Sequence, residues 1–159
     1  MYFTYNCPTH ALDTPYSCDI EKCITLHAIY NQTEIPEEIQ NNMGTCIAQC
    51  CACIDACPKN SKLAYQTEVN VSEDLVYPEI APLVNMTEET FQEKYGGSFL
   101  EFVMTDKKYL QRNAAIAIGN YGDPNYAPTL EHILVTQSEE VIRTAAERSL
   151  VILKATKEL

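Results

Sequence analysis

Eight cysteines are the residues of this 159-residue chain whose type and spacing could do chemistry. Five of them lie within twelve residues, at Cys46, Cys50, Cys51, Cys53 and Cys57. Thiolates bind zinc and iron–sulfur clusters, whereas a disulfide framework requires an oxidising compartment. The opening residues 1–7 lack the basic and apolar regions of a secretory signal. The sequence therefore favours metal or redox chemistry in the cytoplasm.

The segment 50–58 has the spacing C-x2-C-x3-C-P. This is the end of the bacterial ferredoxin run C-x2-C-x2-C-x3-C-P, whose fourth cysteine binds the other cluster in two-cluster proteins. The first cysteine of the run is missing, because Ile47 stands at its position. We expect Cys23 to replace it, from a helix over about 19–30 that Asp19 caps.

The segment 7–12, C-P-T-H-A-L, is similar to the end of an earlier run of the same kind, with His10 where that run has glycine. Because the last cysteine of such a run binds the other cluster, Cys7 is expected to bind the cluster of the second run. The predicted ligands of that [4Fe–4S] cluster are Cys7, Cys23, Cys50 and Cys53. Cys57 would serve a second cluster, whose other ligand positions fall at Phe3 and before Met1. One cluster is thus expected.

Two other interpretations stay open. A structural zinc site could use the Cys50-x2-Cys53 pair, since zinc sites share this spacing. The cysteines could also be buried thiols without a metal. A proline after both Cys7 and Cys57 is less typical of a zinc ribbon and favours the iron–sulfur interpretation. Three further cysteines, Cys18, Cys46 and Cys51, have no assigned role.

The ordered set of motifs resembles the epoxyqueuosine reductase family. Besides the cysteine segments it includes I-P-E-E-I at 35–39, M-T-E-E-x-F at 86–91 and Y-L-Q-R-N-A-A-I-A-I-G-N at 109–120. The resemblance implies cytoplasmic oxidoreductases that reduce epoxyqueuosine to queuosine in tRNA. Such enzymes have an N-terminal cobalamin domain, a double-cluster ferredoxin module and helical repeats that touch tRNA.

The chain resembles the last part of that family only. Cobalamin would then be held by a separate chain or by a missing N-terminal part, and we do not expect this chain to be an active enzyme alone. The resemblance predicts an iron–sulfur electron-transfer portion of an epoxyqueuosine reductase-like protein. The alternative is a zinc-stabilised helical interaction module without a redox role.

The expected architecture is mainly α, with a ferredoxin-like cluster module followed by HEAT-like helical repeats. We place the cluster module at 1–65, a connector with one helix at 66–105 and the repeats at 106–159. Residues 66–85 predict an extended segment because they contain two prolines and little helical periodicity. Thr87 is expected to cap the connector's helix, and Thr136 with Glu139 to form a capping box before the last helix.

Four polar residues cluster at the start of the repeats: Lys107, Lys108, Arg112 and Asn113. By resemblance they are candidates for contact with the tRNA backbone, and the alternative is a solvated helix face. The net charge of −11 argues against a domain that grips nucleic acid by its backbone alone. The sequence has no apolar run long enough for a membrane span, so no membrane partner is expected.

Overall fold

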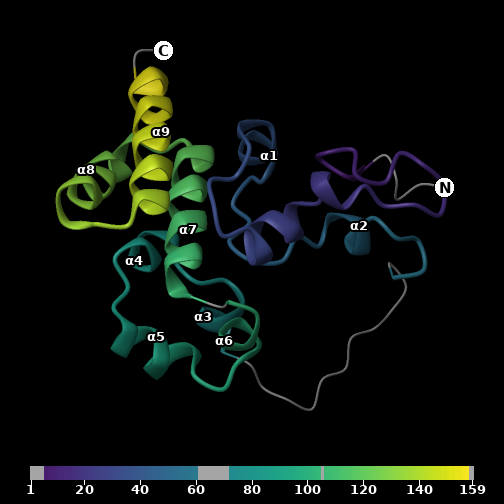
Figure 1. Ribbon diagram of the computed structural model, residues 1–159, viewed down its shortest axis with the longest axis horizontal. Coiled ribbons are helices and arrows are strands. Elements are labelled where there is room, and N and C mark those ends of the chain that lie inside the picture. Colours follow the sequence, from purple (N-terminus) through teal and green to yellow (C-terminus); the bar gives the residue numbers. More distant parts are fainter. Residues whose placement is uncertain (1–5, 61–71, 105, 158–159) are drawn as a thin grey trace.

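The computed structural model describes residues 6–60, 72–104 and 106–157. These residues are mainly helical and include no strand, which confirms the mainly-α prediction. Figure 1 shows a group of packed helices that contains the C-terminus, and an arm of loops and short helices that carries the N-terminal segment. Within the described part, no helix has the length and apolar character needed to cross a membrane.

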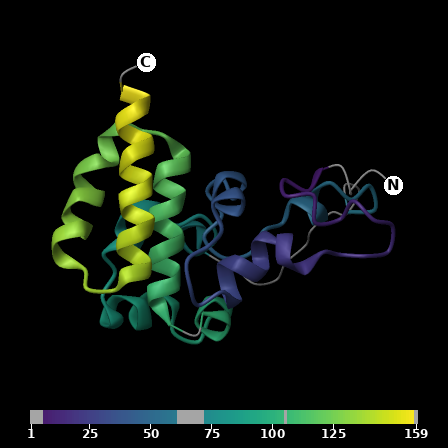
Figure 2. The ribbon, with the colours of Figure 1, turned by 45° about the horizontal axis from the view of Figure 1, so that its top comes forward.

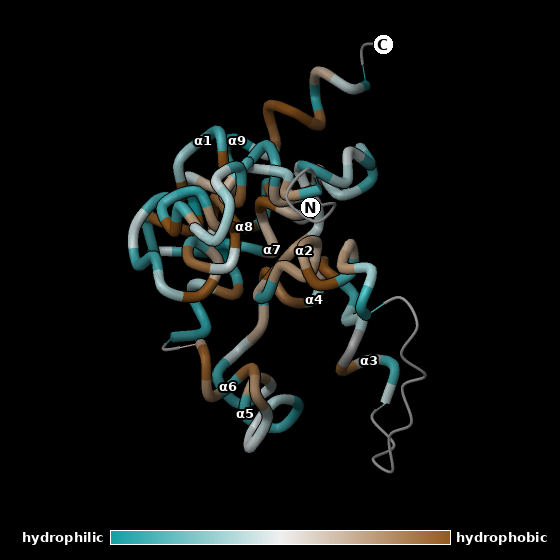
Figure 3. Tube along the Cα trace, turned by 90° about the vertical axis from the view of Figure 1, so that its right-hand side faces the viewer, coloured by the Kyte–Doolittle hydropathy of each residue, from teal (hydrophilic) through white to brown (hydrophobic). Residues whose placement is uncertain are grey.

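Three helices form the C-terminal group: α7 (Lys107–Tyr121), α8 (Ala127–Thr136) and α9 (Glu140–Lys157). They lie side by side in Figure 2, and α9 packs against both other helices. Figure 3 shows polar and apolar residues alternating towards the end of α9. The apolar faces of the three helices meet in fully buried side chains: Leu110, Ala114, Ile118, Leu130, Ile133, Ile142 and Leu153. Their arrangement as HEAT-like repeats stays a prediction.

The ends of these helices follow from local sequence. Asp106 begins α7 by accepting a hydrogen bond from the Lys108 backbone N–H (2.9 Å). Gly122 ends it with a φ of +78°, a left-handed conformation that favours glycine. The capping box predicted before α9 is wrong, because the Thr136 hydroxyl donates to the His132 carbonyl within α8 (2.8 Å).

The connector is more helical than predicted. Its described part contains α3 (Glu73–Val76) and α4 (Ile80–Val84), so the extended segment expected over 66–85 is wrong from residue 72 onward. Pro82 is tolerated because it stands in the first turn of α4, where its missing N–H has no intrahelical partner to lose. Helix α4 packs against α7. The start of this segment and the boundary expected at 65–66 lie outside the described residues.

Two further connector helices follow, α5 (Glu88–Tyr95) and α6 (Phe99–Val103). The cap predicted for α5 is confirmed, because the Thr87 hydroxyl accepts a hydrogen bond from the Thr90 N–H (3.1 Å). Ser98 caps α6 in the same way.

The arm consists of short elements: the 3-10 turn η2 (Ile20–Lys22), the π-helix η3 (Leu26–Tyr30), α1 (Glu37–Asn42) and α2 (Ala52–Asp55). A continuous helix over 19–30 was expected, and this is wrong. The backbone is extended at Cys23, with φ −73° and ψ +119°, so the helical conformation is interrupted at the candidate ligand.

Candidate iron–sulfur site

The candidate ligands come from three segments of the arm. Cys7 lies near its start, Cys23 between η2 and η3, and Cys50 and Cys53 at the beginning of α2. In Figures 1 and 2 the segment that carries α2 runs beside the N-terminal segment. The fold therefore brings together segments that are more than forty residues apart in the sequence.

The pKa of the Cys50 thiol is influenced by the other members of the predicted ligand set. Partial burial raises the pKa of its thiol, the Ala52 N–H opposes this by a hydrogen bond, and the thiolates of Cys53, Cys23 and Cys7 raise the pKa further. The Cys50 backbone N–H also donates to the Thr25 hydroxyl (3.0 Å), which ties this cysteine to the segment after Cys23. Electrostatics and hydrogen bonding thus connect the three segments.

Cys7 lies in a loop that favours its thiolate. The Ala11 N–H donates to its sulfur (3.3 Å), and the Thr9 hydroxyl lies 3.6 Å away. Partial burial alone would raise the pKa of Cys7, but hydrogen bonds from Thr9, Ala11 and Leu12 together outweigh it and lower the pKa. A thiolate held by N–H donors is the chemical form that a metal cluster binds.

His10 shapes this loop. It adopts a φ of +56°, the left-handed conformation that the glycine of the ferredoxin-type run would supply without strain. Its exposed ring lies 3.3 Å from the Asp13 carboxylate, so its contact is with the surface of the loop.

The candidate donors are cysteine thiols, a ligand type that binds both zinc and iron–sulfur clusters. Among the described residues, no three His, Cys, Asp or Glu side chains lie close enough to hold one metal ion. In a four-iron cluster each thiolate binds a different iron, so its sulfurs are farther apart than those around one zinc ion. Four thiols come from three adjoining segments, and the loop around Cys7 already stabilises its thiolate, the form in which cysteine binds a metal centre.

The remaining cysteines have different surroundings. Cys46 is half-buried against the hydrophobic core, and burial together with the neighbouring Cys50 raises the pKa of its thiol to about 11. Cys18 and Cys51 are exposed. Cys57 belongs to the turn after α2, where its carbonyl accepts a hydrogen bond from the Asn60 N–H (2.9 Å).

His27, on the first turn after Cys23, is a structural residue. Its Nε2 lies 2.7 Å from the Glu21 carbonyl, and its Nδ1 lies 3.1 Å from the Asn31 amide nitrogen. With a proton on Nε2, the ring donates to the carbonyl and accepts from the amide. The side chain therefore joins the two ends of the η2–η3 segment.

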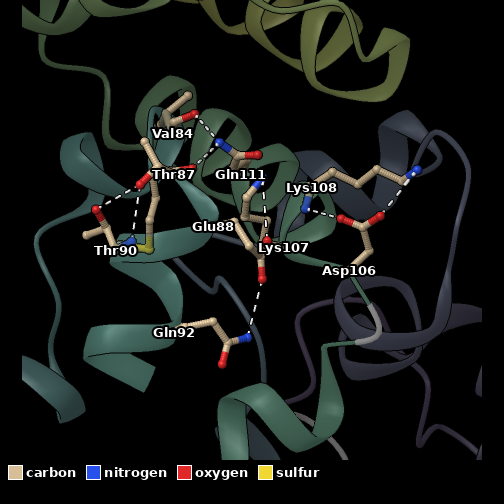
Figure 4. Close-up of polar contacts among 10 residues, drawn as sticks. Val84, Thr87, Glu88, Thr90, Gln92, Asp106, Lys107, Lys108 and Gln111 are labelled. Carbon is tan, nitrogen blue, oxygen red and sulfur yellow. Dashed lines mark hydrogen bonds and ion pairs between the residues drawn. The ribbon is translucent and has the colours of Figure 1, made fainter. Parts of the chain in front are cut away.

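The two lysines at the start of α7 are partly exposed and ion-paired, as Figure 4 shows. The Lys107 ammonium group lies 3.8 Å from the Glu88 carboxylate. The Lys108 ammonium group lies 3.5 Å from Asp106 and 3.3 Å from Glu139. Both lysines remain candidates for phosphate contact, since exposed ion pairs exchange readily.

Arg112 and Asn113 were expected at a tRNA-facing or solvated helix surface, and the structure corrects this. They are 1% and 0% exposed, so neither side chain can reach a nucleic acid in this conformation. Burial lowers the pKa of Arg112 to about 10, which leaves the guanidinium charged at neutral pH. Both side chains donate hydrogen bonds to backbone carbonyls of the arm.

The sequence contained a signal for this burial. All residues from 109 to 119 are buried, and the polar members of the run stand between apolar residues on both sides. A helix that is apolar around its whole circumference has no solvent face for polar side chains. The polar residues of the run therefore had to find partners inside the protein.

Comparison with known proteins agrees with this architecture. No family model matches the chain. It is 33% identical to an epoxyqueuosine reductase of Bacillus cereus, over 88% of this chain and 37% of that protein. An epoxyqueuosine reductase of Synechocystis is 37% identical over 68% of the chain and 38% of its own length. The chain thus spans less than two fifths of these relatives.

Solved structures share the fold. The epoxyqueuosine reductase of Streptococcus thermophilus superposes with a TM-score of 0.86 at 24% identity, over 97% of this chain and 40% of that one. An epoxyqueuosine reductase with an epoxyqueuosine-modified tRNA stem loop has a TM-score of 0.70, also at 24% identity, over 96% of this chain and 49% of that one. The chain therefore belongs to the epoxyqueuosine reductase family, of whose curated members it matches a part.

Proposed function

We propose that this chain is the iron–sulfur electron-transfer portion of an epoxyqueuosine reductase-type protein. One [4Fe–4S] cluster would be held by Cys7, Cys23, Cys50 and Cys53, and Cys57 would be directed to a second cluster. The observation that carries this proposal is the convergence of three segments: the Cys50 N–H donates to the Thr25 hydroxyl just after Cys23, and the α2 segment runs beside the N-terminal segment that holds Cys7.

The residues of this chain would bind the cluster and adjust its reduction potential. When bound, such a cluster accepts and releases single electrons, and hydrogen bonds to its sulfurs adjust the potential. The Ala11 N–H supplies one such bond to Cys7. The Thr25 hydroxyl accepts a hydrogen bond from the Cys50 N–H, which would hold this proposed ligand beside the Cys23 segment.

Cobalamin and the reaction on tRNA belong to the rest of such a protein, on another segment or a separate chain. Lys107 and Lys108 are the residues proposed to contact a tRNA phosphate, by exchanging their carboxylate partners for the phosphate. The support is their partial exposure at the start of α7 and the stem loop bound to a structural neighbour. Arg112 and Asn113 no longer belong to this set.

Metal analysis of anaerobically purified protein tests the proposal. We expect about four irons and four sulfides per chain, with an EPR signal after reduction. A Cys51→Ser variant is the control, because Cys51 is exposed and lies outside the proposed ligand set. Zinc at about one per chain without sulfide would overturn electron transfer and establish the zinc-stabilised module instead.

A further inference from the structure

One amide group of α7 joins two of the cysteine segments. The Asn113 side-chain nitrogen donates to the Ala28 carbonyl (2.7 Å) and to the Ile47 carbonyl (2.8 Å). Ala28 follows Cys23 by five residues, and Ile47 precedes Cys50 by three. One buried side chain therefore joins the two segments that carry these cysteines, in addition to the direct hydrogen bond from the Cys50 N–H to the Thr25 hydroxyl.

Arg112 fixes the orientation of that amide. Its Nε and one terminal nitrogen donate to the Asn113 side-chain oxygen (3.1 and 3.0 Å), so the amide nitrogen must face the carbonyls. The guanidinium also donates to the carbonyls of His27 (3.0 Å), Asn31 (2.6 Å) and Thr33 (2.7 Å). The two side chains thus form one hydrogen-bonded unit against the arm.

The backbone of η3 explains why such a unit is needed. The last carbonyls of any short helix have no partner within the helix and must be satisfied from outside. For the carbonyls of His27 and Ala28 those partners come from α7, eighty-five residues away in the sequence. The contact between η3 and α7 therefore depends on these donors.

We propose that Asn113 is a positioning residue for the cluster, with Arg112 holding its amide in place. It sets the distance and orientation between the Cys23 and Cys50 segments, and through them the fit of the cluster to its thiolates. The proposal rests on the proposed function, because it assumes that a cluster binds there.

The neighbouring Gln111 provides a matched comparison. It lies on the same helix, is 3% exposed, and its amide nitrogen also donates to two carbonyls, Val84 (3.0 Å) and Met86 (3.1 Å). Figure 4 shows this side chain pointing to Val84. Its partners belong to the connector, so the same kind of bond here joins no cysteine segments.

The test compares the isosteric variants Asn113→Asp and Gln111→Glu in the full chain. Each replaces the donating amide by a carboxylate of the same shape, so both lose two carbonyl contacts. We expect Asn113→Asp to lose its cluster to an iron chelator about 10-fold to 100-fold faster than wild type, with a changed EPR line shape. Gln111→Glu should keep the wild-type rate and line shape.

Equal rates in the two variants at equal thermal stability would overturn the positioning role. If Asn113→Asp does not fold, Asn113→Ser takes its place, because its hydroxyl can still donate to one carbonyl. It should give an intermediate rate and an altered line shape, and wild-type behaviour would again overturn the proposal. A wild-type chain that binds no iron and sulfide would instead refute the proposed function itself.

Discussion

The two regions that α7 joins are stabilised in different ways. The C-terminal group has a core of apolar side chains on three helices, with seven large apolar residues fully buried: Leu110, Ile116, Ile118, Leu130, Ile133, Ile142 and Leu153. In the arm, the elements are three to six residues long. Isolated helices of that length are unstable in water.

The difference indicates which interactions stabilise each region. The α7–α9 group buries its own apolar faces, and its structure follows from local pattern and packing. The arm depends on contacts from outside its short elements: apolar side chains such as Ile29, Ile35 and Ile39 join the common core, α7 donates hydrogen bonds to its carbonyls and, in our proposal, a cluster joins its cysteines. The C-terminal group should therefore tolerate loss of the cysteines, whereas the arm should not.

The largest effect is expected from removal of a proposed ligand. Cys53→Ser should reduce bound iron from about four per chain to nearly none, because it removes one of the four proposed thiolates and a serine hydroxyl is a much weaker ligand for iron. Cys57→Ser should retain the cluster, because Cys57 is assigned to a different one. Iron and sulfide analysis measures both, and helicity by circular dichroism should persist in α7–α9. Equal loss of iron in the two variants would refute the ligand assignment.

The same contrast explains what could be predicted from the sequence. The stripes of α7–α9 and the cap at Thr87 were predictable, because helical periodicity and capping are local properties. The interruption at Cys23 was not, because it is set by contacts with distant segments. The cysteine spacing predicted the ligand set, which stays a prediction, but it did not predict the hydrogen bond from the Cys50 N–H to the Thr25 hydroxyl that joins two of its segments.

Arg112 is the clearest example of a side chain whose role could not be predicted from the sequence. A positively charged residue near the start of a helix suggests a surface, and the sequence carries no mark of a carbonyl partner about eighty residues away. The apolar residues on both sides of Arg112 indicate burial, but its partners are set by the packing of α7 against η3, which is a tertiary property. The helix that contains it was predicted, while the role of the side chain was not.

The next largest effect is expected from Arg112→Met, which would remove hydrogen bonds between α7 and the arm. It leaves the carbonyls of His27, Asn31 and Thr33 without their donor, at about 1–3 kcal/mol for the buried His27 contact and less for each of the two part-buried contacts. We expect the free energy of unfolding to fall by several kcal/mol, measured by urea denaturation. Arg143→Met is the control, because Arg143 is exposed on α9. A similar loss in both variants would contradict the role of Arg112.

A smaller effect, confined to the C-terminal group, is expected from Gly119→Ala. A Cβ at position 119 would lie 2.5 Å from the Ser149 hydroxyl and 2.9 Å from its Cα, so α7 and α9 would have to move apart. Overpacking of this kind costs about 1–3 kcal/mol. Adding Ser149→Gly should recover part of the loss in thermal denaturation, since it removes the closest atoms. No recovery would mean that another contact separates the helices.

The smallest effect is expected at the start of α7, from Asp106→Ala. The variant removes the cap on the Lys108 N–H, which typically costs about 1 kcal/mol. Asp106→Asn keeps a capping oxygen but removes the charge that faces the Lys108 ammonium group. Because an exposed ion pair contributes little, this variant should stay close to wild type in thermal denaturation. If Asp106→Asn instead lowers the thermal stability as much as Asp106→Ala does, the ion pair and not the cap stabilises this end of α7. Lys108 would then be less free to exchange its carboxylate partner for a phosphate.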